Sequence, residues 1–477
     1  MAAPASTEQR VMVDPVLMGS LKQLLGDRFS TAPAVLEQHG RDESYHPAVA
    51  PDGVAFATTT AEVAEIVQLC ARHAVPVIPF GTGTSLEGGV AALRGGISVD
   101  LSQMNRVLRV SAADLDCTVE AGVTRKQLNE HLRDTGLFFP IDPGADASLG
   151  GMASTRASGT NAVRYGTMRD NVLGLTVVLA DGRVIRTGGR SRKSSAGYDL
   201  TRLFIGSEGT LGVITEVTLR LYGIPESMSA AVCAFPTIAD AVDTVILTIQ
   251  SGIPVARIEL LDEVQVDASN RFSKLDYKVA PTLFFEFHGT QAGVQEQAEM
   301  VRALAAEHGG EDFRWASRTE DRNRLWQARH DAYYAGLALR PGSRGMPTDV
   351  CVPISRLAEC IVETKRDLAE AGILAPLVGH VGDGNFHLVY VLDPNDDSEI
   401  ARASALHEKL VLRALAMGGT CTGEHGVGYG KMQFMETEHG EAVEVMRQIK
   451  RALDPDNLMN PGKVIRPDIT SSPVNYP

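Results

Sequence analysis

The chain has little cysteine, no surplus of basic residues and no long apolar run. Its six cysteines are scattered over 477 residues and none forms a CxxC pair, so we expect free thiols in a reducing compartment. Lys and Arg number 45 against 59 Asp and Glu, which gives a formal charge of -14. This balance disfavours nucleic-acid binding, because neutralising phosphates needs clustered basic side chains in excess.

No stretch approaches the roughly eighteen uninterrupted apolar residues that a membrane span needs. Residues 1–14 have neither the apolar core of a signal peptide nor the Arg-rich composition of a transit peptide. We therefore expect a cytoplasmic protein, whose sequence is compatible with contact with a membrane surface but not with crossing it. The composition, 44% hydrophobic and 22% charged, is that of a folded protein.

The order of sequence patterns predicts an α+β protein with two main domains. Thr59 and Glu62 fit a capping box before a helix, and an apolar strand at 75–79 leads from that helix into a glycine loop. Strand patterns follow at 175–179 and 213–221. After residue 225, helical stretches at 238–251 and 294–308 alternate with short strands such as 282–287. We expect an N-terminal helical segment (1–44), a first domain (45–224), a second domain (225–453) and a C-terminal segment (454–477) that ends in a tail.

Two glycine loops, Gly81–Gly89 and Pro140–Ser154, lie in the first domain. The first is not a dinucleotide fingerprint, because its third glycine comes too late and no acidic residue follows at the proper distance. Either loop alone would be read as a simple turn. Together with Gly159, Tyr165–Gly166 and Gly206–Gly212, they favour backbone N–H groups placed close to a pyrophosphate.

A second constellation suggests a metal site. His380 and His387 flank a Gly-Asp-Gly-Asn segment that predicts a hairpin turn. Such a turn would bring both imidazoles to the same end of the hairpin, within reach of a common ion. Glu424 and His425 could add a carboxylate ligand and a further imidazole. A single histidine more often only satisfies hydrogen bonds, but the joint arrangement favours a catalytic ion with open positions. The segment at Gly430-Lys431 is not a P-loop, because Met432 stands where Ser or Thr is needed.

These motifs resemble those of FAD-binding oxidoreductases of the vanillyl-alcohol oxidase and p-cresol methylhydroxylase type. The resemblance runs from about Tyr45 to the end and is most specific at Pro79–Gly89, Pro140–Ser154 and Gly419–Gly428. Through Thr348–Leu357 and Gly379–His387 the chain resembles the group of cytochrome-type D-lactate dehydrogenases and glycolate oxidase D subunits. The resemblance implies a two-lobed FAD-binding domain followed by a ferredoxin-like α+β substrate domain.

The resemblance also implies roles for individual residues. Thr84 stands where members that tether FAD covalently often have histidine, so we expect non-covalent FAD. The metal ligands would be His380, His387 and Glu424, the base His425, and the binder of the substrate carboxylate Arg329. The residues expected to bind FAD are Pro79, Gly81, Thr82, Gly83, Thr84, Ser85, Gly88, Gly89, Pro143, Gly144, Ala145, Ser148, Gly150, Gly151, Ser154, Gly159, Tyr165, Gly166, Glu208, Gly209, Gly212, Ile214 and Asn460.

The expected reaction is oxidation of a small D-2-hydroxy acid, with D-lactate to pyruvate favoured. Relatives acting on 2-hydroxyglutarate have polar residues where this chain has Val389 and Met346-Pro-Thr348, so a short apolar tail is favoured. A metal would acidify the hydroxyl, His425 would accept its proton, and hydride would pass to flavin.

Several alternatives remain open from the sequence. They are a glycolate oxidase D-type subunit, a D-2-hydroxyglutarate dehydrogenase-like enzyme, and a colourless zinc hydrolase or binding protein. Because no NAD site is recognisable, the electron acceptor could be a quinone, a cytochrome or an electron-transfer flavoprotein. Zinc, manganese and iron all suit the metal site. The sequence is compatible with a homodimer and does not fix the oligomeric state.

Overall fold

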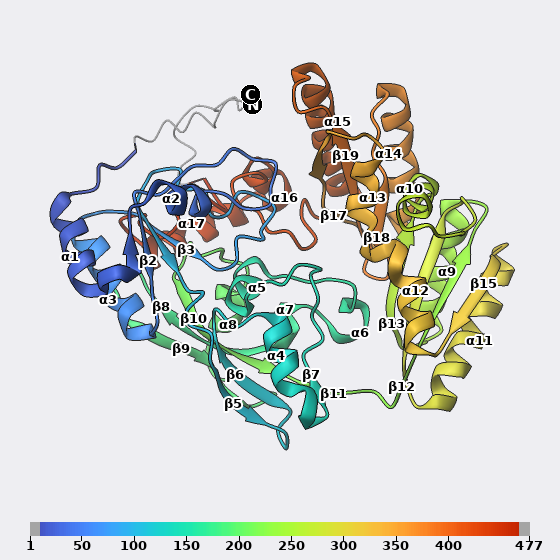
Figure 1. The fold of residues 1–477 in the computed structure, drawn as a ribbon, viewed down its shortest axis with the longest axis horizontal. Helices are drawn as coiled ribbons and strands as arrows, with labels where there is room; N and C mark the ends of the chain where they lie inside the picture. Colours follow the sequence, from blue (N-terminus) through green and yellow to red (C-terminus); the bar gives the residue numbers. More distant parts are fainter. Residues whose placement is uncertain (1–9, 467–477) are drawn as a thin grey trace. The chain divides into compact units, whose positions relative to one another are not determined.

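The computed structural model describes residues 10–466, and these form two compact units (Figure 1). Unit 1 is contained in Met1–Ser158, Gly166–Ile224 and Glu424–Pro477, and unit 2 in Gly159–Tyr165 and Pro225–Gly423. The ranges expected from sequence, 45–224 and 225–453, place Gly159–Tyr165 in the first domain and residues 424–453 in the second, whereas the structure assigns them to unit 2 and unit 1. Tyr165 bonds to a side chain of unit 2, and the loop after Glu424 bonds to carboxylates of unit 1. The expected C-terminal tail beyond Arg466 lies outside the described residues.

A four-stranded sheet of unit 1 carries the first glycine loop. The strand order is β1-β2-β4-β3, in which β2 (Gly53–Phe56) and β3 (Val77–Phe80) run parallel to β4 (Ile97–Asp100) and β1 (Phe29–Ser30) is antiparallel to β2. Helix α1 (Pro15–Leu25) packs against this layer through buried leucines, and α2 (Pro33–His39) follows it. The glycine loop begins directly where β3 ends.

Helix α3 (Thr60–Arg72) connects β2 to β3 and confirms the predicted helix, with Val63, Ile66 and Cys70 buried. Only half of the predicted capping box forms. The Thr59 hydroxyl accepts from the Glu62 backbone N–H, but the Glu62 carboxylate is bonded to Arg28 and to Thr58. The bidentate guanidinium outcompetes the helix N-terminus for this carboxylate, since ionised pairs with two parallel bonds are stronger than a single neutral donor.

A second, antiparallel sheet of unit 1 has the order β5-β6-β10-β8-β9. Its strands, two of which were predicted, are β5 (Val107–Ser111), β6 (Asp116–Glu120), β8 (Val172–Val178), β9 (Val184–Gly188) and β10 (Val213–Arg220). Helices α4 (Arg125–Leu132) and α5 (Leu149–Thr155) bury their leucines in its core, which α17 (Ala442–Leu453) also contacts through Ile449 and Leu453. The second glycine loop enters α5 and is thereby fixed to this core.

Unit 2 contains one eight-stranded antiparallel sheet with the order β15-β12-β14-β13-β18-β19-β16, and β17 pairs with β19. The strands are β12 (Ser227–Ala234), β13 (Val255–Leu261), β14 (Thr282–Gly289), β15 (Glu311–Ala316), β16 (Arg344–Pro347), β17 (Val350–Cys351), β18 (Leu377–His380) and β19 (Asn385–Leu392). The succession β12-α9-β13-β14-α11-β15 is the βαββαβ pattern of ferredoxin-like domains, with one extra helix before β14.

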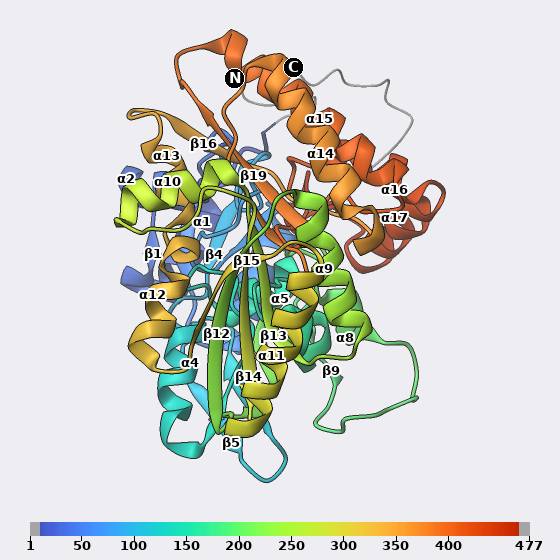
Figure 2. The same ribbon diagram turned by 90° about the vertical axis from the view of Figure 1, so that its right-hand side faces the viewer.

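Helices cover both faces of this sheet. Figure 2 shows α9 (Ile238–Gln250) and α11 (Gln291–Glu307), both predicted from periodicity, in front of β12, β13 and β14. On the opposite face α10 (Glu263–Ser273), α12 (Thr319–His330) and α13 (Ala332–Ala338) share a core with side chains of β12, β13 and β14, including Leu261 and Phe284. That face also carries the polar side chains described below.

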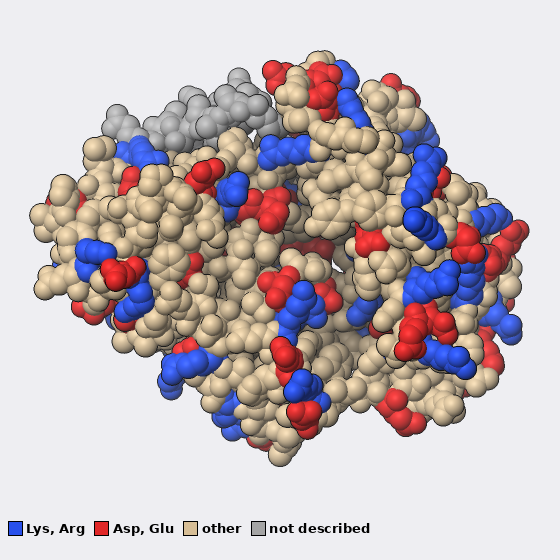
Figure 3. All heavy atoms as spheres, viewed as in Figure 1, with Lys and Arg blue, Asp and Glu red and all other residues tan. Residues whose placement is uncertain are grey.

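Exposed charges of both signs are interspersed within each unit, as the face in Figure 3 shows. Ion pairs such as Arg190–Asp114 in unit 1 and Arg314–Asp276 in unit 2 join neighbours on the surface. None of the helices between Arg10 and Arg466 combines the length and apolar character of a membrane-spanning helix.

Candidate cofactor and metal sites

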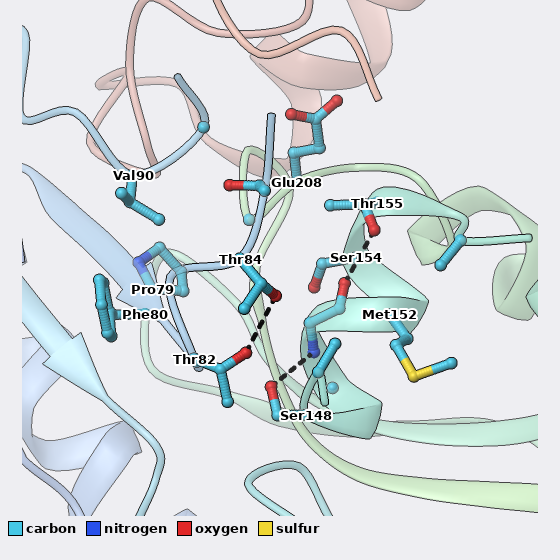
Figure 4. A pocket seen from close by; sticks show the side chains of 18 of the residues that line it. Pro79, Phe80, Thr82, Thr84, Val90, Ser148, Met152, Ser154, Thr155 and Glu208 are labelled. Carbon is cyan, nitrogen blue, oxygen red and sulfur yellow. Dashed lines mark hydrogen bonds between the residues drawn. The ribbon is translucent and has the colours of Figure 1, made fainter. Parts of the chain in front are cut away.

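Unit 1 contains a cavity of about 1180 Å³, including its open mouth, at the end of β3 (Figure 4). It lies between the loop that follows β3 and the N-terminal half of α5. In the figure, the hydroxyl side chains of Thr82, Thr84 and Ser148 lie together on one side. The hydroxyl oxygens of Thr82 and Thr84 are 3.2 Å apart, and the Ser148 hydroxyl accepts from the backbone N–H of Gly151. The lining is therefore small and polar at its centre.

Glycine is needed here because the walls approach closely. A Cβ on Gly81 would lie 2.4 Å from the Ser148 hydroxyl, and one on Gly150 would lie 2.5 Å from the Cβ of Ala121. Side chains at these positions would push the two walls apart. The cavity thus presents backbone rather than side chain to a ligand, as a pyrophosphate requires.

Most residues expected to bind FAD line this cavity. They are Pro79, Gly81, Thr82, Gly83, Thr84, Ser85, Gly89, Pro143, Ala145, Ser148, Gly150, Gly151, Ser154, Glu208, Gly209, Gly212, Ile214 and Asn460. Glu424 and His425, expected to be a metal ligand and the base, line it as well. Lining residues that were not expected to bind FAD include Phe80 and Met152, which lie inside the two glycine motifs, and Val90, Leu101 and Ala121, which lie outside them.

Gly88, Gly144, Gly159, Tyr165 and Gly166 do not line the cavity. Gly88 faces the ring of Tyr429, where a Cβ would come within 2.3 Å, and Gly166 faces Asp170. Gly144 has open space around its Cα. Gly159 and Tyr165 belong to unit 2, where the Tyr165 hydroxyl bonds to His288 at 2.8 Å. The positive φ angles of the four glycines fit tight turns of the chain.

A buried lysine supports the lining residue Asn460. Asn460 has a positive φ of 41° and donates to the carbonyl oxygens of Gly89 and Glu208. Lys463 donates to the Asn460 side chain at 3.0 Å and to Ala91 O at 2.6 Å. Burial lowers the pKa of the Lys463 ammonium to about 7. Asn460 was expected to bind FAD, but Lys463 was not singled out in the sequence, because its partner Ala91 is 372 residues away.

Two buried carboxylates hold the loop that carries His425. Glu208 accepts from the backbone N–H groups of Val427 at 2.6 Å and Gly428 at 2.9 Å. Glu87 lies 3.1 Å from the Lys431 ammonium, and its Oε1 lies 4.0 Å from Nδ1 of His425. The loop is thereby fixed to the Gly81–Gly89 loop and to the Gly206–Gly212 segment of unit 1.

The two carboxylates have opposite pKa shifts. Burial raises the pKa of Glu208 to about 7, although two backbone N–H groups oppose the shift. Burial also pushes the pKa of Glu87 upward, but Lys431 together with His46 and His425 holds it below its usual value. Glu87 is therefore an anion near His425, whereas Glu208 is close to half protonated at neutral pH.

In unit 2 the predicted hairpin is present. Strands β18 and β19 pair with Val378 opposite His387 and His380 opposite Asn385, so both histidines lie on one face of the sheet. Their ring centroids are 5.3 Å apart, and both side chains are buried. Gly384 in the turn has a φ of 78°, and a Cβ there would lie 2.1 Å from Val352 O, so the sharp turn depends on glycine.

Hydrogen bonds fix the tautomers of both histidines. His380 Nδ1 lies 2.7 Å from a carboxylate oxygen of Glu259, and His387 Nδ1 lies 2.9 Å from the carbonyl oxygen of Thr348. A carbonyl and an ionised carboxylate can only accept, so Nδ1 carries the proton in each ring and Nε2 is the ligating atom. Such partners orient imidazoles in metal sites.

Glu259, which sequence reasoning missed, also holds Arg329. The guanidinium Nε donates to the second carboxylate oxygen at 2.7 Å, and the Glu259 side chain is 0% exposed. Burial pushes its pKa upward, but His380 and Arg329 hold it below its usual value. Its signal in the sequence was a lone acid within the apolar run Ile258-Glu-Leu-Leu261. Arg329 is therefore tied to a buried acid rather than being the solvated helix charge that its sequence context alone suggests.

Val389 follows His387 on the same face of β19 and is buried. Met346 and Pro347 of β16 pair with Tyr390 and Val389, so the two substitutions that favour an apolar substrate tail lie on neighbouring strands.

Two family descriptions match the chain. "FAD binding domain" matches residues 51–188, and "FAD linked oxidases, C-terminal domain" matches residues 224–464. A Danio rerio protein named "Probable D-lactate dehydrogenase, mitochondrial" is 57% identical over 94% of this chain and 91% of its own length. An Arabidopsis thaliana protein named "D-lactate dehydrogenase [cytochrome], mitochondrial" is 49% identical over 95% of this chain and 80% of its own length.

A solved structure of p-cresol methylhydroxylase with substrate bound aligns with a TM-score of 0.78 at 20% identity, covering 95% of this chain and 98% of that chain. This confirms the expected two-domain fold. The names of the two relatives overturn the expected cytoplasmic location, since both are called mitochondrial. The free cysteines had indicated only a reducing environment, which does not specify a compartment. The matched domains, the relatives and the fold together show that the chain belongs to the FAD-linked oxidases.

Proposed function

We propose that this chain is an FAD- and divalent-metal-dependent dehydrogenase that oxidises a small D-2-hydroxy acid, D-lactate foremost, to its 2-oxo acid. The names of its relatives support the substrate. The observation that carries the metal dependence is the pair His380 and His387, whose Nδ1 atoms are both engaged as donors. Packing alone does not require two imidazoles to be oriented in this way on one face of a sheet, whereas metal ligation does.

In this proposal His380, His387 and Glu424 hold the metal. The donor set of two imidazoles and one carboxylate suits zinc, manganese or iron and leaves positions open for substrate oxygens. An ion held there supplies Lewis acidity, which lowers the pKa of the substrate hydroxyl. FAD, bound non-covalently in the cavity beside Thr84, supplies the two-electron acceptor.

The protein's own side chains orient the substrate and move its proton. Arg329 is proposed to bind the substrate carboxylate through its Nη atoms, because its Nε is engaged by Glu259. His425 is proposed to accept the hydroxyl proton at Nε2, because Nδ1 faces the Glu87 anion. The substrate then loses a proton from oxygen and a hydride from carbon, which completes a two-electron oxidation.

The short substrate tail and the electron acceptor are also proposals. The buried Val389 and its cross-strand partner Pro347 provide no polar partner for a second carboxylate, which favours D-lactate or D-2-hydroxybutyrate over 2-hydroxyglutarate. A cytochrome is the proposed acceptor, supported by the name of the Arabidopsis relative.

The test is the visible spectrum of the purified protein under anaerobic conditions, before and after D-lactate is added, with L-lactate as control. A yellow protein bleached only by D-lactate is expected. A protein that is colourless and does not take up FAD would contradict the proposal. A yellow protein that is bleached by glycolate but not by D-lactate would instead support the glycolate oxidase type of enzyme.

A further inference from the structure

Two similar clusters lie on the same face of the unit 2 sheet, on adjacent strands. In each, one buried glutamate is shared by a histidine and an arginine. Glu259 on β13 is shared by His380 and Arg329, at 2.7 Å each. Glu286 on β14 is shared by His288 at 2.9 Å and Arg257 at 3.4 Å. Because the clusters are chemically alike, one serves as an internal control for the other.

The clusters differ in the roles of the groups that each glutamate holds. Both ring nitrogens of His288 are engaged within unit 2, one by Glu286 and the other by the Tyr165 hydroxyl. The Glu286 cluster therefore anchors the segment Gly159–Tyr165, in which Asn161 Oδ1 also accepts a hydrogen bond from Arg257 Nε. The Glu259 cluster instead contains a proposed metal ligand and the proposed carboxylate binder. It joins two functions that the reaction must bring together.

We propose that Glu259 is a positioning residue that orients His380 and Arg329 together, so that metal binding and recognition of the substrate carboxylate depend on one buried side chain. This inference rests on the proposed function. Glu259 accepts the Nδ1 proton of His380 with one oxygen and the Nε proton of Arg329 with the other. Neither donor can rotate away without leaving a fully buried carboxylate oxygen unpaired, which is costly.

Only a carboxylate satisfies both partners. A glutamine of the same shape has one accepting oxygen and one NH2 group, and the NH2 group would face either His380 Nδ1–H or Arg329 Nε–H. Donor would then oppose donor at one of the two contacts. Glu259→Gln therefore removes one orientation with little change in side-chain volume. Glu259→Asp keeps both acceptors but withdraws them by about one C–C bond, about 1.5 Å.

The experiment compares the full-length wild type with Glu259→Gln, Glu259→Asp and the matched control Glu286→Gln. The first readout is the dissociation constant of Zn²⁺, measured by competition with a coloured chelator in the absence of substrate. The second is the split between KM and kcat for D-lactate at saturating metal. The third is the flavin absorbance spectrum, which reports on the cavity of unit 1.

We expect Glu259→Gln to weaken Zn²⁺ binding by about 10- to 100-fold and to raise the KM for D-lactate at least about 10-fold even at saturating metal. Glu259→Asp should recover part of both losses. Glu286→Gln should shift both constants less than about 3-fold, and no variant should change the flavin spectrum. If Glu259→Gln does not fold, Glu259→Asp tests the same coupling with the carboxylate kept.

Unchanged Zn²⁺ affinity and KM in Glu259→Gln would overturn the inference, and so would equal losses in Glu286→Gln, which would indicate a general effect of removing a buried acid. The proposed function fails differently: the wild type itself would then not be bleached by D-lactate. A wild type that is bleached, with a Glu259→Gln variant that binds Zn²⁺ normally, would leave the function standing and remove only the role of Glu259.

Discussion

At the residue scale, the carboxylates of unit 1 show how burial sets a pH dependence. Glu208 has a folded-state pKa of about 7 against an ordinary value of 4.5. Between these values the folded state holds a proton that the unfolded state has released. The stabilising contribution is therefore complete below about pH 4.5 and lost as pH rises through about 7. The difference between the two pKa values of Glu208 corresponds to at most roughly 3 kcal/mol in the free energy of unfolding.

We predict that the contribution of Glu208 to the thermal midpoint of the FAD-free protein is lost between about pH 5 and about pH 8, so that the pH slope of the midpoint is less negative in Glu208→Gln than in the wild type, because the amide does not titrate. The control is Glu62→Gln. The pKa of Glu62 is lowered to about 2 by its bonds to Arg28, so its contribution changes only below about pH 4.5. The pH slope should persist in Glu62→Gln; a slope that also persists undiminished in Glu208→Gln would argue against the raised pKa.

His425 is the residue whose removal most directly tests the proposed proton transfer. We predict that His425→Ala keeps its flavin but is reduced by D-lactate about 10²- to 10⁴-fold more slowly, since a positioned base contributes that much. Stopped-flow absorbance under anaerobic conditions measures the rate. His439→Ala is the control, because His439 lies in unit 1 but outside the cavity lining. A near-normal rate in His425→Ala would rule out its role as the base.

At the scale of elements, the β18–β19 hairpin shows how a turn positions the proposed ligands. Gly384 and Gly372 both have a positive φ, 78° and 66°, so alanine at either position is strained by about 1–2 kcal/mol. The two positions differ in the space around them. A Cβ on Gly384 would lie 2.1 Å from Val352 O, whereas a Cβ on Gly372 would have no heavy atom within 4 Å. Only Gly384→Ala should therefore displace the turn between His380 and His387.

We predict that both variants unfold at a lower temperature, and that Gly384→Ala alone binds Zn²⁺ more weakly, by at least about 10-fold. Chelator competition and a thermal melt of each variant measure the two effects. Equal Zn²⁺ affinities in Gly384→Ala and Gly372→Ala would show that the turn does not determine the spacing of the imidazoles.

The sequence predicted the elements better than the contacts between them. Local periodicity was enough for α3 and α9, and the Gly-Asp-Gly-Asn turn for the β18–β19 hairpin, because each depends on residues close in the chain. The capping box failed at Glu62 because Arg28, 34 residues earlier, binds the same carboxylate. Glu259 and Lys463 were missed for the same reason. Their partners are distant in sequence, and nothing local indicates which buried charge pairs with which donor.

At the scale of the whole molecule, the chain passes between its two units several times. Unit 1 is interrupted first by the short segment Gly159–Tyr165 and then by Pro225–Gly423, which together form unit 2, and the chain re-enters unit 1 at Glu424. The cofactor cavity lies within unit 1, and the two buried histidines lie within unit 2. The proposed FAD site therefore lies in unit 1, and the two imidazole ligands of the proposed metal lie in unit 2.

We predict that FAD and Zn²⁺ protect different amides from hydrogen exchange in the full-length protein. A ligand that binds only the native state raises the free energy of opening by RT ln(1 + [L]/Kd), about 2.7 kcal/mol at 100 Kd. FAD should slow exchange in β3 and α5, which border the cavity, and Zn²⁺ should slow it in β18 and β19. The Zn²⁺ effect should vanish in His380→Gln while the FAD effect remains. Because the amides of β3 and β18 belong to separate cores, protection by Zn²⁺ that remains in His380→Gln would mean that the ion binds elsewhere, and the metal role of the hairpin would be wrong.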